Sequence, residues 1–215
     1  AGDILNVFQL DSEHIAFYLL DVVGKGVPAA LLSVTLSRFL SPLAGSSLLE
    51  SADSPGNFPS PSELATELNK RFPMDDDNQQ NFTLLYGYYN PRTRELSFVS
   101  AGHPGPLYIP AEGQPEILDC DGFPVGIFPE PDYVDHTLVL QPGDRIVLYS
   151  DGLLDAENPH GAYFEKKGLL DWADQEHESL QDEMTTLHDR VTSFCNGHSQ
   201  TDDISVLAMR VRQEP

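Results

Sequence analysis

Cysteine, basic residues and long apolar runs are all scarce in this chain of 215 residues. Its two cysteines, Cys120 and Cys195, form no CxxC pair, and we expect both to be free, buried thiols in a reducing cytoplasm. No uninterrupted apolar stretch is long enough to cross a bilayer, so no membrane-spanning segment is expected. The length fits one globular domain with a substantial hydrophobic core.

The shortage of basic residues leaves the chain strongly acidic. Lys and Arg number 12 against 34 Asp and Glu, which gives a formal net charge of −22 at pH 7. Nucleic acids and anionic membranes repel such a protein, so neither is expected as its partner. The charge suits solubility, cation binding or a basic protein partner.

Hydrophobic patterning arranges strands and helices in blocks. Strands are expected over residues 4–10, 15–20, 107–109, 116–118, 134–140, 146–149 and 204–211, with a hairpin over residues 82–100 that turns at Asn90-Pro91. Helices are expected over residues 27–40, 62–72, 165–173 and 179–195. Because the two kinds of element do not alternate regularly, the order favours an α+β layered domain over a parallel doubly wound sheet.

Two of the expected helices have recognisable ends and faces. The helix over residues 27–40 has an apolar stripe made of Leu31, Leu32, Leu36, Phe39 and Leu40. Ser60 can cap the next helix, with Glu63 reaching back to complete a capping box. The Ser-, Pro- and Gly-rich stretch between the two helices and the acidic residues 75–80 are expected to be loops.

Acidic residues stand at the boundaries of several expected strands: Asp3, Asp21, Asp151, Asp202 and Asp203. Carboxylates that converge repel one another unless protons or cations neutralise them. Oxygen-only ligation favours Mg²⁺ or Mn²⁺ over Zn²⁺, and two such ions roughly 3.5–4 Å apart can activate a water and clamp a phosphoryl oxygen. Each Asp taken alone is more typical of a turn or a strand cap, so the metal site is a hypothesis about the whole set.

Three other features carry weaker signals. The segment Gly24-Lys25-Gly26 is not a P-loop, because Gly rather than Ser or Thr follows the lysine. His103 has no HxH or HExxH spacing around it, which favours a structural role. Trp172 lies in an apolar helical stretch and is expected in the core.

Six segments together resemble a known family: AGD, DVVGKGVPAALLS, AGHPGPLYI, GFPVGIF, YSDGLLDAEN and TDDISVLAMRV, which begin at residues 1, 21, 101, 122, 149 and 201. In this order they are similar to the bacterial branch of the metal-dependent serine/threonine protein phosphatases (PPM type), and more narrowly to the stage II sporulation protein E-like domains. The resemblance spans essentially the whole chain. It implies a central β-sandwich of two antiparallel sheets with helices on both outer faces.

The resemblance also implies a site for two Mn²⁺ or Mg²⁺ ions. Its ligands would be Asp3, Asp21, the backbone carbonyl of Val22, Asp151, and Asp202 with Asp203 as the rival for the same position. Asp21 would bridge both ions, and Asp21 and Asp151 would be catalytic through a metal-activated water. That water would attack the phosphorus of a phosphoserine or phosphothreonine in line.

Partners and context follow from the same resemblance. The implied function is dephosphorylation of a regulatory protein, such as an anti-sigma-factor antagonist, in bacterial two-component or sigma-factor signalling. We expect residues 1–215 to be a single cytoplasmic phosphatase domain, excised from a longer protein in which it follows a receiver or sensor domain. Such an output domain of a response regulator is also compatible with a homodimer.

Departures from the family pattern support an alternative. Asn6 stands near the place of a second Asp, Ala1 replaces the usual Gly, and Lys25 occupies the region where eukaryotic relatives carry a His. The alternative is a catalytically weak or inactive adaptor that binds a sigma factor or an anti-sigma-factor antagonist.

Overall fold

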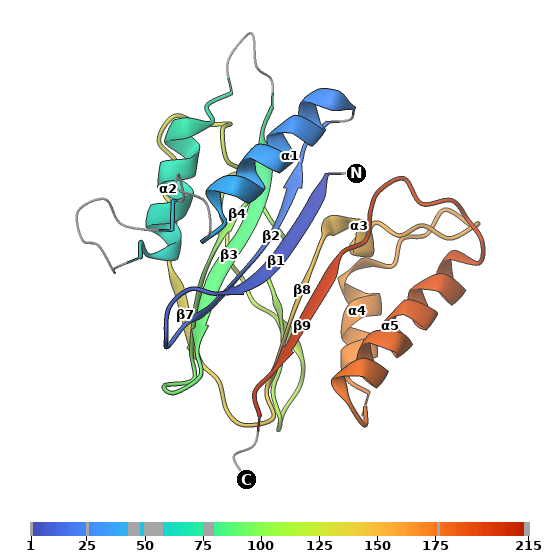
Figure 1. Ribbon diagram of the computed structural model, residues 1–215. Coiled ribbons are helices and arrows are strands. Elements are labelled where there is room, and N and C mark those ends of the chain that lie inside the picture. The colour runs from blue at the N-terminus through green and yellow to red at the C-terminus, as the bar shows by residue number, and fades with distance from the viewer. Residues whose placement is uncertain are drawn as a thin grey trace. The chain divides into compact units, whose positions relative to one another are not determined.

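The computed structural model describes residues 2–24, 26–42, 48–49, 58–74, 80–175 and 177–212. The chain divides into two units, Ala1–Pro104 with Cys120–Val139, and Gly105–Asp119 with Leu140–Pro215. Each unit contains one antiparallel sheet and the helices that pack on it (Figure 1). The predicted α+β class with two antiparallel sheets is confirmed.

The sheet of the first unit has five strands in the order β1-β2-β3-β4-β7. Their bounds are β1 (Asp3–Gln9), β2 (Ile15–Val22), β3 (Phe82–Asn90), β4 (Glu95–Ala101) and β7 (His136–Val139). All neighbouring strands pair antiparallel. β3 and β4 form the predicted hairpin, with residues 91–94 as its turn.

The turn between β1 and β2 fixes the register of these two strands. Asp11 Oδ1 accepts hydrogen bonds from the backbone N–H groups of Glu13 and His14, each 2.7 Å long, and lies 2.9 Å from His14 Nδ1. An aspartate that bonds to the backbone two and three residues onward holds a tight turn. Counted from this turn, the register places Asp3 opposite Asp21 at the far end of the pair.

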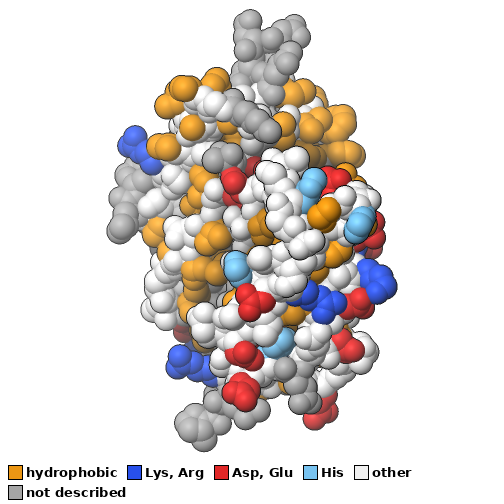
Figure 2. Space-filling model, turned by 90° about the vertical axis from the view of Figure 1, so that its right-hand side faces the viewer, with side chains coloured by type: hydrophobic (Ala, Val, Ile, Leu, Met, Phe, Trp, Pro, Cys, Tyr) orange, Lys and Arg blue, Asp and Glu red, His pale blue; other side chains and the backbone are white. Residues whose placement is uncertain are grey.

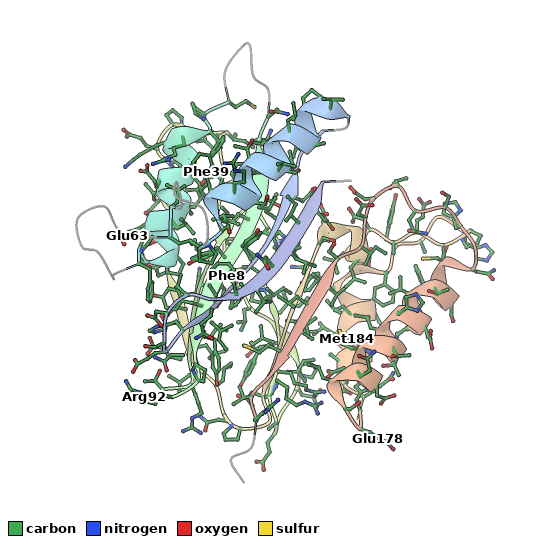
Figure 3. All side chains as sticks on the ribbon, in the orientation of Figure 1. Phe8, Phe39, Glu63, Arg92, Glu178 and Met184 are labelled. Carbon is green, nitrogen blue, oxygen red and sulfur yellow. The ribbon has the colours of Figure 1, made fainter. Side chains whose placement is uncertain are left out.

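Helices α1 (Val27–Phe39) and α2 (Pro61–Arg71) cover one face of this sheet (Figure 1). Alternate residues of the strands point toward the helices, and side chains of both are buried together. The strands contribute Ala16, Tyr18, Leu20, Val22, Phe82, Leu84 and Tyr86, and the helices contribute Leu32, Leu36, Leu64 and Leu68. Phe8 from β1 and Phe39 from α1 pack against this core (Figure 3). The predicted capping box is confirmed, since Ser60 accepts from the N–H of Glu63 and the Glu63 carboxylate accepts from that of Ser60.

The predicted apolar stripe of α1 is wrong at Leu31, whose side chain is 63% exposed. Leu32, Leu36 and Leu40 are buried and recur every four residues, as one helix face requires. Leu31 lies about 100° around the helix from Leu32, on the outward face that also carries the exposed Val27. Most of the loop predicted after α1 and the acidic turn over residues 75–80 lie outside the described residues.

The sheet of the second unit has the order β6-β5-β8-β9. Its strands are β5 (Leu107–Ile109), β6 (Glu116–Ile117), β8 (Arg145–Tyr149) and β9 (Val206–Arg210), and its helices are α3 (Asp151–Leu154), α4 (Glu165–Ala173) and α5 (Leu180–Cys195). Trp172 is fully buried in the core under these helices, as predicted, and its indole N–H donates to Thr186 Oγ1 at 3.1 Å. α3 was not expected from the sequence, because four residues are too few to show a helical period.

The expectations drawn from composition concern disulfide bonds, membrane-spanning segments and the distribution of charge. Cys120 and Cys195 are both buried, and neither is in a disulfide bond. Among the described residues, no helix is long and apolar enough to span a membrane. On the side of the molecule drawn in Figure 2, acidic side chains are interspersed with hydrophobic ones rather than gathered in one patch.

Replacing Asp11 with Asn is expected to weaken the β1–β2 turn in a pH-dependent way. Burial alone would raise the pKa of Asp11, but hydrogen bonds from Glu13 and His14 outweigh burial and hold that pKa below its ordinary value. The ionised carboxylate therefore stabilises the fold above the unfolded pKa of about 3.9, and this contribution is lost as the pH falls through the folded pKa. At pH 7 the variant should lose about 1 kcal/mol of unfolding free energy in urea denaturation.

The difference between the two proteins should begin to narrow below the unfolded pKa of about 3.9 and continue to narrow as the pH falls toward the lower pKa of folded Asp11. Asp132→Asn is the matched control, since Asp132 is exposed and belongs to the same unit. A stability difference for Asp11→Asn that stays equal at pH 7 and at about pH 3 would contradict the assignment.

Candidate functional site

Two of the predicted acids meet at one end of the first unit's sheet. Asp3 opens β1, Asp21 lies one residue before the end of β2, and the two are paired across the strands. A Cβ atom added to Gly2 would lie 2.2 Å from Asp21 Oδ1 and 2.7 Å from the carbonyl oxygen of Val22. These two oxygens therefore converge beside the backbone of Gly2, where only glycine leaves room for them.

The other three predicted acids gather at one end of the second unit's sheet. Asp151 follows β8 and begins α3, whereas Asp202 and Asp203 precede β9. β8 and β9 are antiparallel, with Tyr149 paired to Val206, so the end of β8 and the beginning of β9 lie together. Strand pairing thus brings Asp151 near an aspartate pair that follows it by about 50 residues in the sequence.

Ser150 fastens these two segments to each other. Its backbone N–H donates to the carbonyl of Ser205 at 3.0 Å, and its Oγ accepts from the N–H of Ser205 at 2.9 Å and donates to the carbonyl of Asp203 at 3.3 Å. Gly152 allows the close approach, because a Cβ there would lie 2.1 Å from the carbonyl oxygen of Asp203. In the Ser-Asp-Gly sequence, the serine therefore supplies the hydrogen bonds between the two segments, and the glycine leaves the space that these bonds require.

Asp155 joins this acidic cluster, although the sequence gave no sufficient reason to include it. Burial raises its pKa, and the carboxylates of Asp151 and Asp202 raise it further. The backbone N–H of Asp155 donates to the carbonyl of Asp151 at 2.9 Å, closing the single turn of α3. The spacing of four residues from Asp151 was the available signal, since such a pair shares one side of a helical turn.

All of these carboxylate and carbonyl groups would bind a metal through oxygen, the ligand atom that Mg²⁺ and Mn²⁺ prefer. In the part of the chain that the structure describes, no group of three or more His, Cys, Asp or Glu side chains is arranged to hold a metal ion. Asp3, Asp21 and Val22 belong to the first unit, and Asp151, Asp202 and Asp203 to the second. The donor chemistry fits the predicted cations, and the meeting of the two sets of acids stays a prediction.

Of three other residues singled out in the sequence, only His103 can be placed. His103 is buried, its ring Nδ1 lies 3.1 Å from the carbonyl of Pro104, and its own carbonyl accepts from the hydroxyl of Ser100 at 2.7 Å. These contacts agree with the structural role predicted for it. Ala1 and Lys25 lie outside the described residues.

Known proteins share both the sequence pattern and the fold. The family described as Stage II sporulation protein E (SpoIIE) matches residues 11–212. Phosphoserine phosphatase RsbU of Bacillus subtilis (strain 168) is 27% identical over 213 residues, which cover 98% of this chain and 59% of RsbU. The chain thus spans about three-fifths of the length of this curated relative.

Two solved structures have the same fold. The SiaA-PP2C domain of Pseudomonas aeruginosa superposes with a TM-score of 0.77 at 21% identity and covers 97% of this chain and 80% of that one. RsbX in complex with magnesium superposes with a TM-score of 0.63 at 16% identity and covers 97% of this chain and 86% of that one. The resemblance predicted from the six sequence segments is confirmed.

Removing the Ser150 hydroxyl is expected to loosen the acidic end of β8 and β9. Ser150→Ala leaves the part-buried N–H of Ser205 without its acceptor, so the free energy of unfolding should fall by about 1 kcal/mol. Ser205→Ala is the matched control: Ser205 contributes only backbone groups to this contact, and its stability should change by less than about 0.5 kcal/mol. Thermal and urea denaturation would measure both variants, and equal losses would show that Ser150 does not fasten the segments.

Proposed function

The chain belongs to the stage II sporulation protein E family, and we propose that it dephosphorylates phosphoserine or phosphothreonine on a regulatory protein in a metal-dependent reaction. The observation that carries this proposal is the position of the acids. Asp3 pairs with Asp21 at one strand end, and Asp151 lies near Asp202 at another. The relative RsbU, which carries the name phosphoserine phosphatase, supports the class of substrate.

The acids would bind divalent cations together. Asp3, Asp21 and the carbonyl of Val22 would supply oxygen ligands from the first unit, and Asp151 with Asp202 or Asp203 would supply them from the second. Bound Mn²⁺ or Mg²⁺ would supply an activated water and polarise a phosphoryl oxygen. The magnesium complex of RsbX supports cations of this kind.

The protein groups around these acids have positioning roles in this proposal. Gly2 leaves space for the Asp21 carboxylate and the Val22 carbonyl to point the same way. Ser150 and Gly152 hold the chain around Asp203 against α3. Such support under each carboxylate would hold its oxygens in place and so lower the cost of organising the site.

We further propose that the substrate is a phosphorylated regulator such as an anti-sigma-factor antagonist, and that the domain acts as the output of an upstream receiver or sensor domain. A homodimer is compatible with such a role. The strongly negative charge of the chain supports a protein substrate that approaches with basic side chains near its phosphorylated residue.

Asp21→Asn and Asp151→Asn are each expected to lower phosphatase activity at least about 100-fold, because each removes a charged ligand of the proposed cations. Hydrolysis of p-nitrophenyl phosphate and of a phosphoserine protein with Mn²⁺ present would measure the effect. Asp132→Asn and Asp189→Asn, at exposed aspartates of the first and second units, are matched controls that should keep full activity. Activity in the Asp21 and Asp151 variants equal to that of the controls would reject the proposal.

Calorimetric titration with Mn²⁺ distinguishes the hypothesis of an enzyme from that of an inactive adaptor. We expect binding at two sites in the natural sequence, and the loss of binding at one or both when Asp21 is replaced by Asn, because Asp21 is the proposed bridging ligand. No heat of binding in the natural sequence, together with retained binding of a sigma factor or of its regulator, would favour the inactive adaptor instead.

A further inference from the structure

The second unit has a recess that lies away from its acidic cluster. It is a cavity of about 450 Å³, lined by Ile109, Pro110, Arg145, Ala173, His177 and Arg210 among others. Arg145 begins β8 and Arg210 ends β9, whereas Asp151 follows β8 and Asp202 precedes β9. The recess is therefore at the opposite end of the same two strands, each of which is about 13 Å long at a rise of about 3.3 Å per residue.

The two arginines of this recess share one buried carboxylate. They are paired across β8 and β9, and both reach Glu183 of α5, Arg145 Nη1 at 2.8 Å and Arg210 Nη2 at 3.4 Å. The Glu183 side chain is fully buried, whereas those of Arg145 and Arg210 are 13% and 31% exposed. Glu183 lies between Glu178 and Met184, which Figure 3 labels at the beginning of α5.

This arrangement leaves positive charge and hydrogen-bond donors facing the cavity. Two guanidinium groups and one carboxylate sum to a local charge of +1 in a chain whose total charge is −22. A guanidinium has five N–H donors, and Arg145 and Arg210 each use one of them on Glu183. Asp174, also on the cavity wall, is exposed, so water screens most of its charge.

A buried imidazole among the residues of the cavity wall has a polar atom without a partner. The His177 side chain is 2% exposed, and its Nε2 has no hydrogen-bond partner among the described residues. Its Nδ1 lies 3.3 Å from Thr186 Oγ1, whose own proton goes to the carbonyl of Glu183 at 2.9 Å. Nδ1 is therefore the donor in that contact, and Nε2 of the neutral ring is left as an acceptor that a bound water can bridge to a ligand, because buried polar atoms are rarely without a partner.

We infer that this recess binds the carboxylate of a small organic ligand. A carboxylate matches the planar fork of an arginine, and a single negative charge neutralises the local charge of +1. Ile109, Pro110 and Ala173 supply an apolar wall for the rest of the ligand, and the volume suits a small molecule. This inference rests on the second unit alone and does not depend on phosphatase activity.

Titration with sodium benzoate at constant ionic strength, followed by ¹⁵N nuclear magnetic resonance, tests the site. We expect saturable shifts of the Arg145 and Arg210 Nε–H signals and of the backbone around residues 110–115. Benzamide, which has the same ring without the charge, should give no such shifts. Inorganic phosphate serves as the competing oxyanion, and saturable binding of phosphate without binding of benzoate would overturn the choice of a carboxylate.

Two variants connect binding to the recess. Arg210→Gln keeps the bond between Arg145 and Glu183 and should weaken benzoate binding about tenfold or more, since it removes a charged donor. Ala111→Phe leaves every charge in place and should weaken binding by filling the cavity, on whose wall Ala111 lies. Arg92→Gln, an exposed position of the first unit labelled in Figure 3, changes the net charge equally and should bind benzoate normally.

Each of the remaining outcomes decides the matter. Benzoate shifts that are equal in Arg210→Gln, Ala111→Phe and the Arg92→Gln control would overturn the inference, because binding would then be elsewhere. An absence of saturable shifts in the natural sequence would show that Arg145, Glu183 and Arg210 only join α5 to the sheet. The backbone spectrum of each variant shows whether it is folded, so a loss of binding can be distinguished from unfolding.

Discussion

Antiparallel pairing decides which side chains share an end of a sheet, and the chemistry proposed for this protein depends on it. The Asp11 turn sets the β1–β2 register and thereby places Asp3 opposite Asp21. In the same way, the pairing of β8 with β9 gathers Asp151 and Asp202, which are distant in the sequence. A slip of one residue would turn alternate side chains to the other face and separate each set.

Like charges held close together cost free energy, so the backbone under them has to resist their repulsion. Here small residues hold the backbone under the acids in place. Gly2 and Gly152 remove the Cβ atoms that would push the oxygens apart, and Ser150 joins the two segments through three hydrogen bonds. The groups that support these acids are therefore neutral and add no further charge repulsion.

Residues and elements could be predicted from the sequence where a short local pattern marks them. Groups of residues that lie far apart along the chain could not be predicted. Asp21 and Asp151 could be singled out because each follows an apolar run and has a glycine within the next three residues, and the hairpin and the capping box have short signatures of their own. Arg145, Glu183 and Arg210 could not be grouped, because 38 and 27 residues separate the two arginines from the glutamate. The exposed face of α1 was misjudged because adjacent leucines leave the direction of a helix face ambiguous by about 100°.

The two cysteines have a use that follows from where they are buried. Cys120 belongs to the first unit and Cys195 to the second, and neither is bonded to another cysteine. Burial raises the pKa of the Cys195 thiol, which keeps it in its unreactive form while α5 is folded. An alkylating reagent would therefore modify each cysteine only as its surroundings open, so the chain carries one natural reporter of local unfolding in each unit.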